Sequence, residues 1–330
     1  MGRLNPPGYQ RFVQAREFEI SYAGGEANVA VSLANYGMDA SYVTKLPSND
    51  IAKAAVRELK AHSVDTSDIV YGGERLGLYF CEKGASQRAS KVIYDRKYSS
   101  ISMAEQSDFD WDKIFDGADW FHFTGITPAL SDNCAAICLD AVKAAKAKNV
   151  KVSCDLNFRK NLWTSEKAGK VMAGLMEYVD VAIANEEDCE KVFGIKAENT
   201  DITGGTLSKD GYIKVAKTLS EKFNIPTVAI TLRGSISASD NNWAAMLYQN
   251  GEVFFSKNYL IRIVDRVGGG DSFGGGLIYA LREGYNGQDA IEFAVAASCL
   301  KHTIEHDFNE ATLDEVKNLM GGDGSGRVQR

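Results

Sequence analysis

The stretch Asp265-Arg266-Val267-Gly268-Gly269-Gly270-Asp271-Ser272-Phe273 is the most informative part of this sequence. An apolar segment, 259–264, precedes it, and apolar residues at helical spacing follow it. We therefore expect the glycines to lie between a strand and the first turn of a helix. Glycines at a helix entrance leave backbone N–H groups accessible, and the helix dipole adds positive charge. The sequence thus predicts an anion hole at Gly268, Gly269 and Gly270.

Asp271 stands in the first turn of that helix, where its carboxylate would face a bound phosphate. Because like charges repel, a carboxylate there needs a purpose, and accepting a proton from a hydroxyl that attacks the γ-phosphorus is the obvious one. The alternative is a glycine-rich turn with Asp271 as an ordinary helix residue, and glycine content alone does not separate the two. The chain has no G-x4-G-K-[ST] and no early G-x-G-x-x-G, which argues against a P-loop and disfavours a dinucleotide-binding oxidoreductase.

Strands and helices alternate outward from this stretch, beginning near residue 131. The apolar spacing predicts helices over 135–148, 166–178, 209–223, 271–282 and 288–306. It predicts strands over 150–154, 179–184 and 227–232, and a hairpin of 244–248 with 252–255 around Asn250-Gly251. This alternation is typical of an α/β fold, a mostly parallel sheet with helices on both faces.

The first hundred residues follow a different pattern. We expect helices over 28–36 and 51–62, but strands over 12–22, 76–82 and 91–98. Such strands do not interleave with helices, so we expect a small separate β-sheet lid on the α/β core. The expected division is a core of 24–70 and 108–320, a lid of 4–23 and 71–107, and a flexible Gly-rich tail, 321–330.

Composition limits the classes of function. The 330 residues contain 37 Lys and Arg against 44 Asp and Glu, a formal charge of −7, which argues against nucleic acid as a partner. Anionic small substrates stay possible, because a few local Arg residues can bind one. No apolar run approaches the roughly 20 residues of a membrane span, and the first ten residues are not a secretory signal. The six cysteines form no CxxC and are typical of reduced thiols in a cytoplasmic protein.

Two motifs carry a resemblance to a known family. The segment Gly24-Gly25-Glu26-Ala27-Asn28-Val29-Ala30 resembles the N-terminal signature of the ribokinase-like (PfkB) carbohydrate kinases. The stretch 265–271 resembles their C-terminal D-T-x-G-A-G-D signature, with Arg266 in place of Thr and Gly269 in place of Ala. The segments 6–12, 83–88 and 92–96 further resemble the members that phosphorylate 2-keto-3-deoxygluconate. The resemblance implies a ribokinase-like core with a β-sheet lid, and ATP-dependent transfer to the terminal hydroxyl of that sugar acid, giving the 6-phosphate. ATP and Mg²⁺ are the implied cofactors, with K⁺ as a candidate further one.

The resemblance also assigns residues. It implies Asp271 as the catalytic base and Gly268, Gly269 and Gly270 as the anion hole. The implied substrate-binding residues are Gly24, Gly25, Asn28, Tyr79, Tyr94, Arg96, Arg159 and Asp307, the last also near a monovalent cation. The implied nucleotide-binding residues are Asn157, Asn185, Thr231, Arg233, Gly234, Ser235, Gly268 and Gly270, with His302 nearby. Asp188 would act on Mg²⁺ indirectly, and it is a shorter carboxylate than the Glu that the family has there.

Arg96 and Arg159 bear on the choice of substrate. Their forked donors can bind a carboxylate, which a sugar acid has and a neutral sugar lacks. Two alternatives stay open: a kinase for a neutral sugar such as fructose or ribose, and a catalytically inactive sensor that binds a sugar acid. A lid sheet with open edges also gains from pairing with a copy of itself, so we expect a homo-oligomer formed through the lid.

The start of the chain departs from the family pattern. Relatives of this kind begin with a buried strand, whereas only Met1-Gly2-Arg3 precedes Leu4-Asn5 here. Either the sequence is truncated at its start or another element fills the gap. A parallel sheet without a central strand exposes apolar faces and unpaired backbone groups, so we predict poor stability for this chain.

Overall fold

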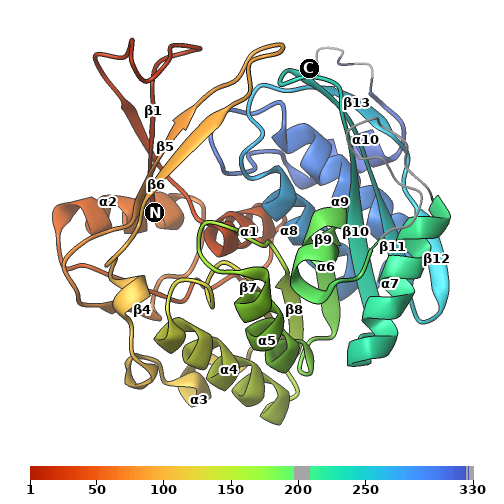
Figure 1. Ribbon diagram of the computed structural model, residues 1–330, viewed down its shortest axis with the longest axis horizontal. Helices are drawn as coiled ribbons and strands as arrows, with labels where there is room; N and C mark the ends of the chain where they lie inside the picture. The colour runs from red at the N-terminus through yellow and green to blue at the C-terminus, as the bar shows by residue number, and fades with distance from the viewer. Residues whose placement is uncertain (197–208, 325, 327–330) are drawn as a thin grey trace.

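One large sheet forms the centre of the computed structural model, which describes residues 1–196, 209–324 and 326. Its strand order is β12-β11-β10-β9-β8-β7, with β13 paired to the first half of β11 (Figure 1). The bounds are β7 (Trp120–Thr124), β8 (Lys151–Asp155), β9 (Val181–Asn185), β10 (Thr227–Ser235), β11 (Asp240–Gln249), β12 (Glu252–Phe255) and β13 (Tyr259–Arg262). Strands β7 to β10 run parallel, and the rest form an antiparallel extension. The expected α/β architecture is confirmed.

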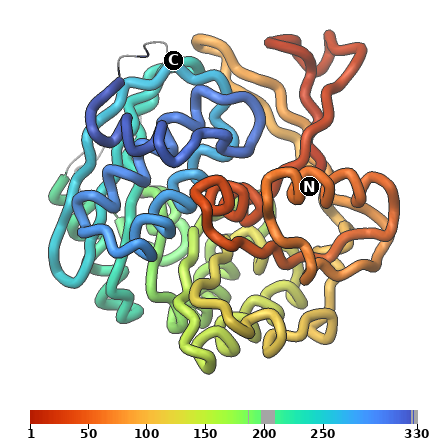
Figure 2. The backbone as a smooth tube through the Cα atoms, turned by 180° about the vertical axis from the view of Figure 1, so that it is seen from behind, coloured from red at the N-terminus to blue at the C-terminus, as the bar shows by residue number. Residues whose placement is uncertain are grey.

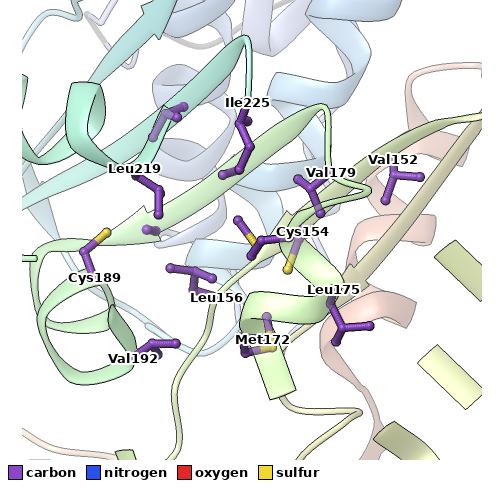
Figure 3. Close-up of a cluster of buried hydrophobic side chains, with 14 of the residues drawn as sticks. Val152, Cys154, Leu156, Met172, Leu175, Val179, Cys189, Val192, Leu219 and Ile225 are labelled. Atoms are coloured by element: carbon purple, nitrogen blue, oxygen red, sulfur yellow. The ribbon is translucent and has the colours of Figure 1, made fainter. Parts of the chain in front are cut away.

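Helices cover both faces of this sheet. One face carries α3 (Trp111–Ile114), α4 (Asp132–Ala147), α5 (Ser165–Met176), α6 (Glu186–Phe193) and α7 (Lys209–Phe223). The other carries α1 (Gly25–Asn35), α8 (Gly269–Arg282), α9 (Gly287–Lys301) and α10 (Leu313–Met320), and Figure 2 shows α8 and α9 from that side. Figure 3 shows the first of the two apolar cores, where Cys154 of β8 lies among side chains of the covering helices such as Met172 and Leu219.

The turn between β11 and β12 forms at Asn250-Gly251, where the sequence predicts it. Asn250 (φ 50°) and Gly251 (φ 94°) both adopt the left-handed conformation between β11 and β12. Tight hairpins need this conformation at both central positions, and Asn-Gly adopts it at little cost. The hairpin expected here is confirmed, although β11 begins at Asp240, before the expected residue 244.

A separate four-stranded sheet stands at one end of the core. Its order is β2-β1-β5-β6, from β1 (Gly2–Asn5), β2 (Glu19–Tyr22), β5 (Leu78–Glu82) and β6 (Lys91–Asp95), and Figure 1 shows it apart from the large sheet. The expectation of a small separate sheet is confirmed, but the strand expected over 12–22 is wrong for 12–18. Pro6 and Pro7 follow β1 and lack the N–H that a ladder needs. The residues before Glu19 therefore have no strand to pair with.

The β-structure is interrupted next to β7. Strands β3 (Thr44–Leu46) and β4 (Ile69–Tyr71) form a parallel pair of their own, and α2 (Asp50–Ala61) packs against them. Neither β3 nor the free edge of β7 has a further strand partner among the described residues. A cavity of about 1510 Å³ is lined by residues of both strands, including Thr44 and Phe121.

Two further expectations concern the ends and surface of the chain. No helix in the described part of the chain is both long and apolar enough to cross a membrane. The tail expected to be flexible, 321–330, lies partly outside the described residues, which leave out 325 and 327–330.

Candidate active site

The cavity opens where the parallel strands end. Asp155 at the end of β8, Asn185 at the end of β9 and Thr231 on β10 all line it. Ligands in open α/β sheets bind beyond the carboxyl ends of the strands, so this is the position expected for a site. The small sheet supplies Tyr79, Tyr94 and Arg96 to the same cavity, which brings the expected lid residues and core residues together.

The glycines at the start of α8 have three different surroundings. Gly268 adopts a left-handed φ of 84°, and a side chain there would overlap the carbonyl oxygen of Asp307. A side chain on Gly269 would overlap the His302 ring, and the Gly269 N–H donates to the carbonyl of Arg266 at 3.3 Å. Gly270 has open space beside it. The N–H groups of Gly270 and Asp271 have no acceptor among the described residues, so these two N–H groups can bind an anion.

Asp271 is held by the N-terminal motif. The Asn28 amide donates to Asp271 Oδ2 at 2.6 Å, while the N–H of Gly24 donates to Asn28 Oδ1 at 3.3 Å and so fixes which end of the amide faces Asp271. Gly25 lies beside this contact, since an added Cβ would lie 3.6 Å from Asp271 Oδ1 and 3.3 Å from Thr124 Cγ2. Burial raises the pKa of Asp271 to about 6, against the opposing effect of the Asn28 hydrogen bond. A carboxylate with that pKa is a competent proton acceptor near neutral pH.

Two arginines line the cavity, Arg96 directly after strand β6 of the small sheet and Arg159 after strand β8 of the large one. Arg96 is 8 % exposed, its Nε has no hydrogen-bond partner, and its guanidinium lies 4.1 Å from the centre of the Tyr94 ring. Burial and the nearby Arg159 lower the pKa of Arg96. Neither arginine forms an ion pair with a described residue; Arg159 donates only to the carbonyl of Phe158, at 3.1 Å. Buried cations are normally paired, so the buried Arg96 and the half-buried Arg159 together can provide an anion site.

Asp307 lies in a buried ionic cluster that the sequence did not reveal. Its Oδ1 accepts from Arg3 Nη1 at 2.6 Å, and the Tyr79 hydroxyl lies 2.7 Å from each of its oxygens. Arg3 is fully buried and also binds Asp265, at 2.5 Å. Burial and Asp307 raise the pKa of Tyr79, which keeps its hydroxyl protonated. No local signal marks Arg3, because its two partners lie 262 and 304 residues away in the sequence.

The expected nucleotide-binding residues divide into two groups. Thr231, Arg233, Asn157 and Asn185 line the cavity, whereas Gly234 and Ser235 continue β10 beyond its lining. Arg266, which stands where the family has Thr, also lines the cavity, and Arg233 and burial both lower its pKa. Arg233 and Arg266 therefore form a second concentration of positive charge, which suits a polyphosphate.

Asp188 and Asp155 are two carboxylates that line the cavity near the ends of β9 and β8. Asp188 is buried, and its oxygens accept the N–H groups of Phe158 at 3.0 Å and Asn185 at 3.4 Å, which completes the cap of α6. Asp155 also lines the cavity, and burial, Asp188 and Asp271 raise its pKa well above the ordinary value. No cluster of three or more His, Cys, Asp or Glu suited to a metal ion occurs in the described ranges.

His302 forms a wall of the anion hole. Its Nδ1 lies 2.7 Å from the carbonyl oxygen of Ser298, and its ring lies 4.9 Å from the ring of Trp243. Burial lowers its pKa to about 4, so the ring is neutral at physiological pH. His302 therefore shapes the hole without adding charge.

Known proteins resemble the chain over almost its whole length. The family model described as pfkB family carbohydrate kinase matches residues 3–305. The crystal structure of 2-dehydro-3-deoxygluconokinase from Thermotoga maritima has a TM-score of 0.94 and 53% identity, over 98% of this chain and 96% of that one. A 2-dehydro-3-deoxygalactonokinase of Haloferax volcanii is 30% identical over 99% of this chain and 96% of its own length. A 2-dehydro-3-deoxygluconokinase of Thermoproteus tenax is 27% identical over 92% of this chain and 86% of its own length.

Proposed function

The chain belongs to the pfkB family of carbohydrate kinases, and on that premise we propose that it transfers the γ-phosphoryl group of ATP to 2-keto-3-deoxygluconate, also called 2-dehydro-3-deoxygluconate. The terminal hydroxyl accepts the group, and the product is the 6-phosphate. The names of the similar kinases from Thermotoga maritima and Thermoproteus tenax support this substrate. The name of the Haloferax volcanii relative makes the galactonate epimer the second candidate.

One observation carries the assignment to a sugar acid: Arg96 and Arg159 face a common cavity with no carboxylate partner among the described residues. Arg96 is buried and Arg159 is half-buried, and two guanidinium groups in such surroundings repel each other unless an anion lies between them. The carboxylate of a sugar acid is such an anion, and it can accept forked hydrogen bonds from both. A neutral sugar offers no charge to offset this repulsion, so fructose and ribose are poorer fits.

The residues around Asp271 support a direct transfer. Asp271 accepts the proton of the attacking hydroxyl while Asn28 holds the carboxylate in place. The free N–H groups of Gly270 and Asp271 stabilise the charge on the transferring phosphoryl group. Arg233 and Arg266 neutralise the remaining phosphates. The sheet of β1, β2, β5 and β6 excludes water when substrate is bound, which keeps ATP from being hydrolysed.

Magnesium enters with ATP in this account. Mg²⁺ prefers oxygen ligands, and when bound with ATP it would reduce the charge on the γ-phosphoryl group. Asp188 already accepts two backbone N–H groups, so we assign it an indirect role, through the position of Asn185 and the loop at Phe158. The surroundings of Asp307 do not fit K⁺, because Arg3 and Lys301 already supply positive charge there. We therefore assign no step to K⁺.

We also propose that the kinase acts in the cytoplasm and forms a dimer through its small sheet. The cysteines are free and mostly buried, as expected in a reducing compartment. Strand β6 is an edge strand that exposes Val92, Ile93 and Tyr94. An apolar edge of this kind can pair with a second copy of itself.

The experiment for this function compares KM values in Arg96→Ala and Arg159→Ala. We expect each change to raise KM for 2-keto-3-deoxygluconate about tenfold or more, since a charged hydrogen bond contributes about 1.5–3 kcal/mol. KM for ATP should change far less. Lys317→Ala on α10 is the control, because this exposed side chain lies outside the cavity. Equal effects on the two KM values would contradict carboxylate recognition by this pair.

A further inference from the structure

Lys301 is a buried cation that has no part in the proposed transfer reaction. It is the last residue of α9 and is fully buried. Its ammonium donates to the carbonyl oxygens of Ile304, at 3.3 Å, and Asp265, at 3.5 Å. It forms no ion pair within 4.0 Å with any carboxylate in the described part of the chain. Lysine is almost never fully buried without a partner, so its position calls for an explanation.

The two carbonyls belong to the two segments that shape the anion hole. Asp265 begins the stretch that leads into Gly268, and Ile304 lies in the turn that ends at Asp307, whose carbonyl packs against Gly268. The N–H of Val264 also donates to the carbonyl of His302, at 2.8 Å. The ammonium therefore links these two segments, both of which contact the glycines of the anion hole.

Arg3 and Lys301 together offset the charges of Asp265 and Asp307 without any added ion. Arg3 already pairs with Asp265 and Asp307, the two carboxylates nearest to the ammonium besides Asp271. Burial and Arg3 lower the pKa of Lys301, these three carboxylates raise it, and the result is about 8. Most of the ammonium is therefore charged at neutral pH. Two cations face the two paired carboxylates, so little negative charge is left to attract a metal ion.

We propose that the Lys301 ammonium is a built-in monovalent cation, which positions the two backbone segments of the anion hole and makes the kinase independent of K⁺. An ammonium group and K⁺ both bind carbonyl oxygens and both carry a single positive charge. Lys301 touches neither substrate, so it is a positioning residue. The rate measurements that test this inference rest on the proposed kinase function. The measurements of Tm do not depend on that function.

The first test needs only the wild-type protein. The rate of ADP release and the Tm are measured while KCl replaces tetramethylammonium chloride at constant ionic strength. We expect neither quantity to change, because the cation position is filled. A several-fold activation by K⁺, or a rise in Tm specific to K⁺, would overturn the proposal. If no sugar acid is phosphorylated, the proposed function fails, and the Tm series still decides this inference.

The second test separates the charge from the packing. Lys301→Ala removes the ammonium and leaves space, whereas Lys301→Met fills much of the space without charge. We expect both variants to lose about tenfold or more in rate, with KM for ATP raised, because the anion hole is less ordered. K⁺ or ethylammonium should restore most of the rate in Lys301→Ala and none in Lys301→Met. Lys257→Ala is the matched control, because Lys257 also donates to a backbone carbonyl, that of Met320, but is exposed and far from the cavity.

The variants also offer outcomes against the proposal. A folded Lys301→Ala protein that keeps the wild-type rate would overturn it, and so would one that loses the rate and regains nothing with either cation. If Lys301→Ala does not fold, the wild-type ion series and Lys301→Met decide: an unchanged rate in folded Lys301→Met contradicts the proposal.

Discussion

Asp271 is held in place by the Asn28 amide, 2.6 Å away, and this hydrogen bond partly offsets the rise in the Asp271 pKa that burial causes. Since that hydrogen bond favours the charged form, its loss must raise the pKa of Asp271 above its value of about 6. Asp271 has to be ionised to accept a proton, so the rate falls as the pH drops through this pKa. The acid limb of the rate against pH therefore reports directly on the hydrogen bond between Asn28 and Asp271.

We predict that Asn28→Leu shifts the acid limb of kcat/KM against pH upward by about one unit, the size expected from a charge-assisted hydrogen bond of roughly 1.5 kcal/mol. Ser32→Ala, one turn further along α1, is the control, because its hydroxyl bonds only to a backbone carbonyl. An acid limb that stays in place in Asn28→Leu would show that Asp271 is not the titrating base.

The glycines of the anion hole give a second prediction at this scale. Gly270→Ala should fold as well as the wild type or better, by up to about 1 kcal/mol, because alanine favours a helix and nothing obstructs its Cβ. The new methyl group points into the space for the phosphoryl group, so the rate should fall about tenfold or more. Gly268→Ala should destabilise the protein by about 1–3 kcal/mol, because of its left-handed φ and the overlap with Asp307.

Urea unfolding and ADP-release assays on both variants check the glycine prediction. Full activity in Gly270→Ala would exclude this space as the phosphoryl site. Comparing the two variants distinguishes a glycine required for space in the fold, Gly268, from one required for activity, Gly270. The sequence pattern alone does not make this distinction.

Residues inside a motif were predictable, and residues that meet through long-range contacts were not. Asp271, Gly270 and Asn28 stand in two short motifs, and the structure brings them together. Arg3 and Lys301 stand in no motif, and their importance comes from partners contributed by distant segments. Burial of a charged side chain is a property of the folded chain, so local sequence does not reveal it.

Among the elements, most of the predicted helices and parallel strands agree with the structure to within a few residues, because their apolar periodicity is set by the core that they cover. Helices α3, α6 and α10 and the parallel strands β3, β4 and β7 were not predicted. The strand over 12–22 was predicted too long, since alternation alone does not say whether a partner strand is present. Pro6 and Pro7 end β1, so β2 pairs with β1 only as far as Asn5 and Glu19. The segment 6–18 is therefore a loop, in which Phe12 and Phe18 stack at 6.4 Å.

The edge strand β6 of the small sheet is where we expect two copies of the chain to pair. Ile93 on β6 is 55 % exposed, and we expect Ile93→Lys to convert a dimer to a monomer, because a charge on an edge strand opposes pairing. Val13→Lys is the control, because Val13 is 90 % exposed in the loop and not on the edge. Sedimentation velocity gives the mass of each protein. A wild-type monomer, or a dimer unaffected by Ile93→Lys, would contradict association through β6.

At the scale of the whole molecule, the main feature is the interruption between β3 and β7. Within the described part of the chain both strands have an edge without a strand partner, and a cavity of about 1510 Å³ is lined by both. Buried backbone groups without partners and lost packing both lower stability. Only the folded structure locates the interruption, between β3 and β7.

We predict that this chain unfolds at a low temperature or without a sharp transition. Circular dichroism during heating measures this, with and without MgATP, whose binding to the folded state alone would raise the Tm. A cooperative transition well above room temperature in the absence of ligand would contradict the prediction.

The central claim is that the chain is a sugar-acid kinase with Asp271 as its base. An ADP-release assay over sugars and sugar acids, with wild type and Asp271→Asn, tests it most directly. We predict turnover with 2-keto-3-deoxygluconate and not with fructose or ribose, and a loss of about 10²-fold or more in Asp271→Asn. Turnover with a neutral sugar alone, no turnover with any substrate, or full activity in Asp271→Asn would contradict it.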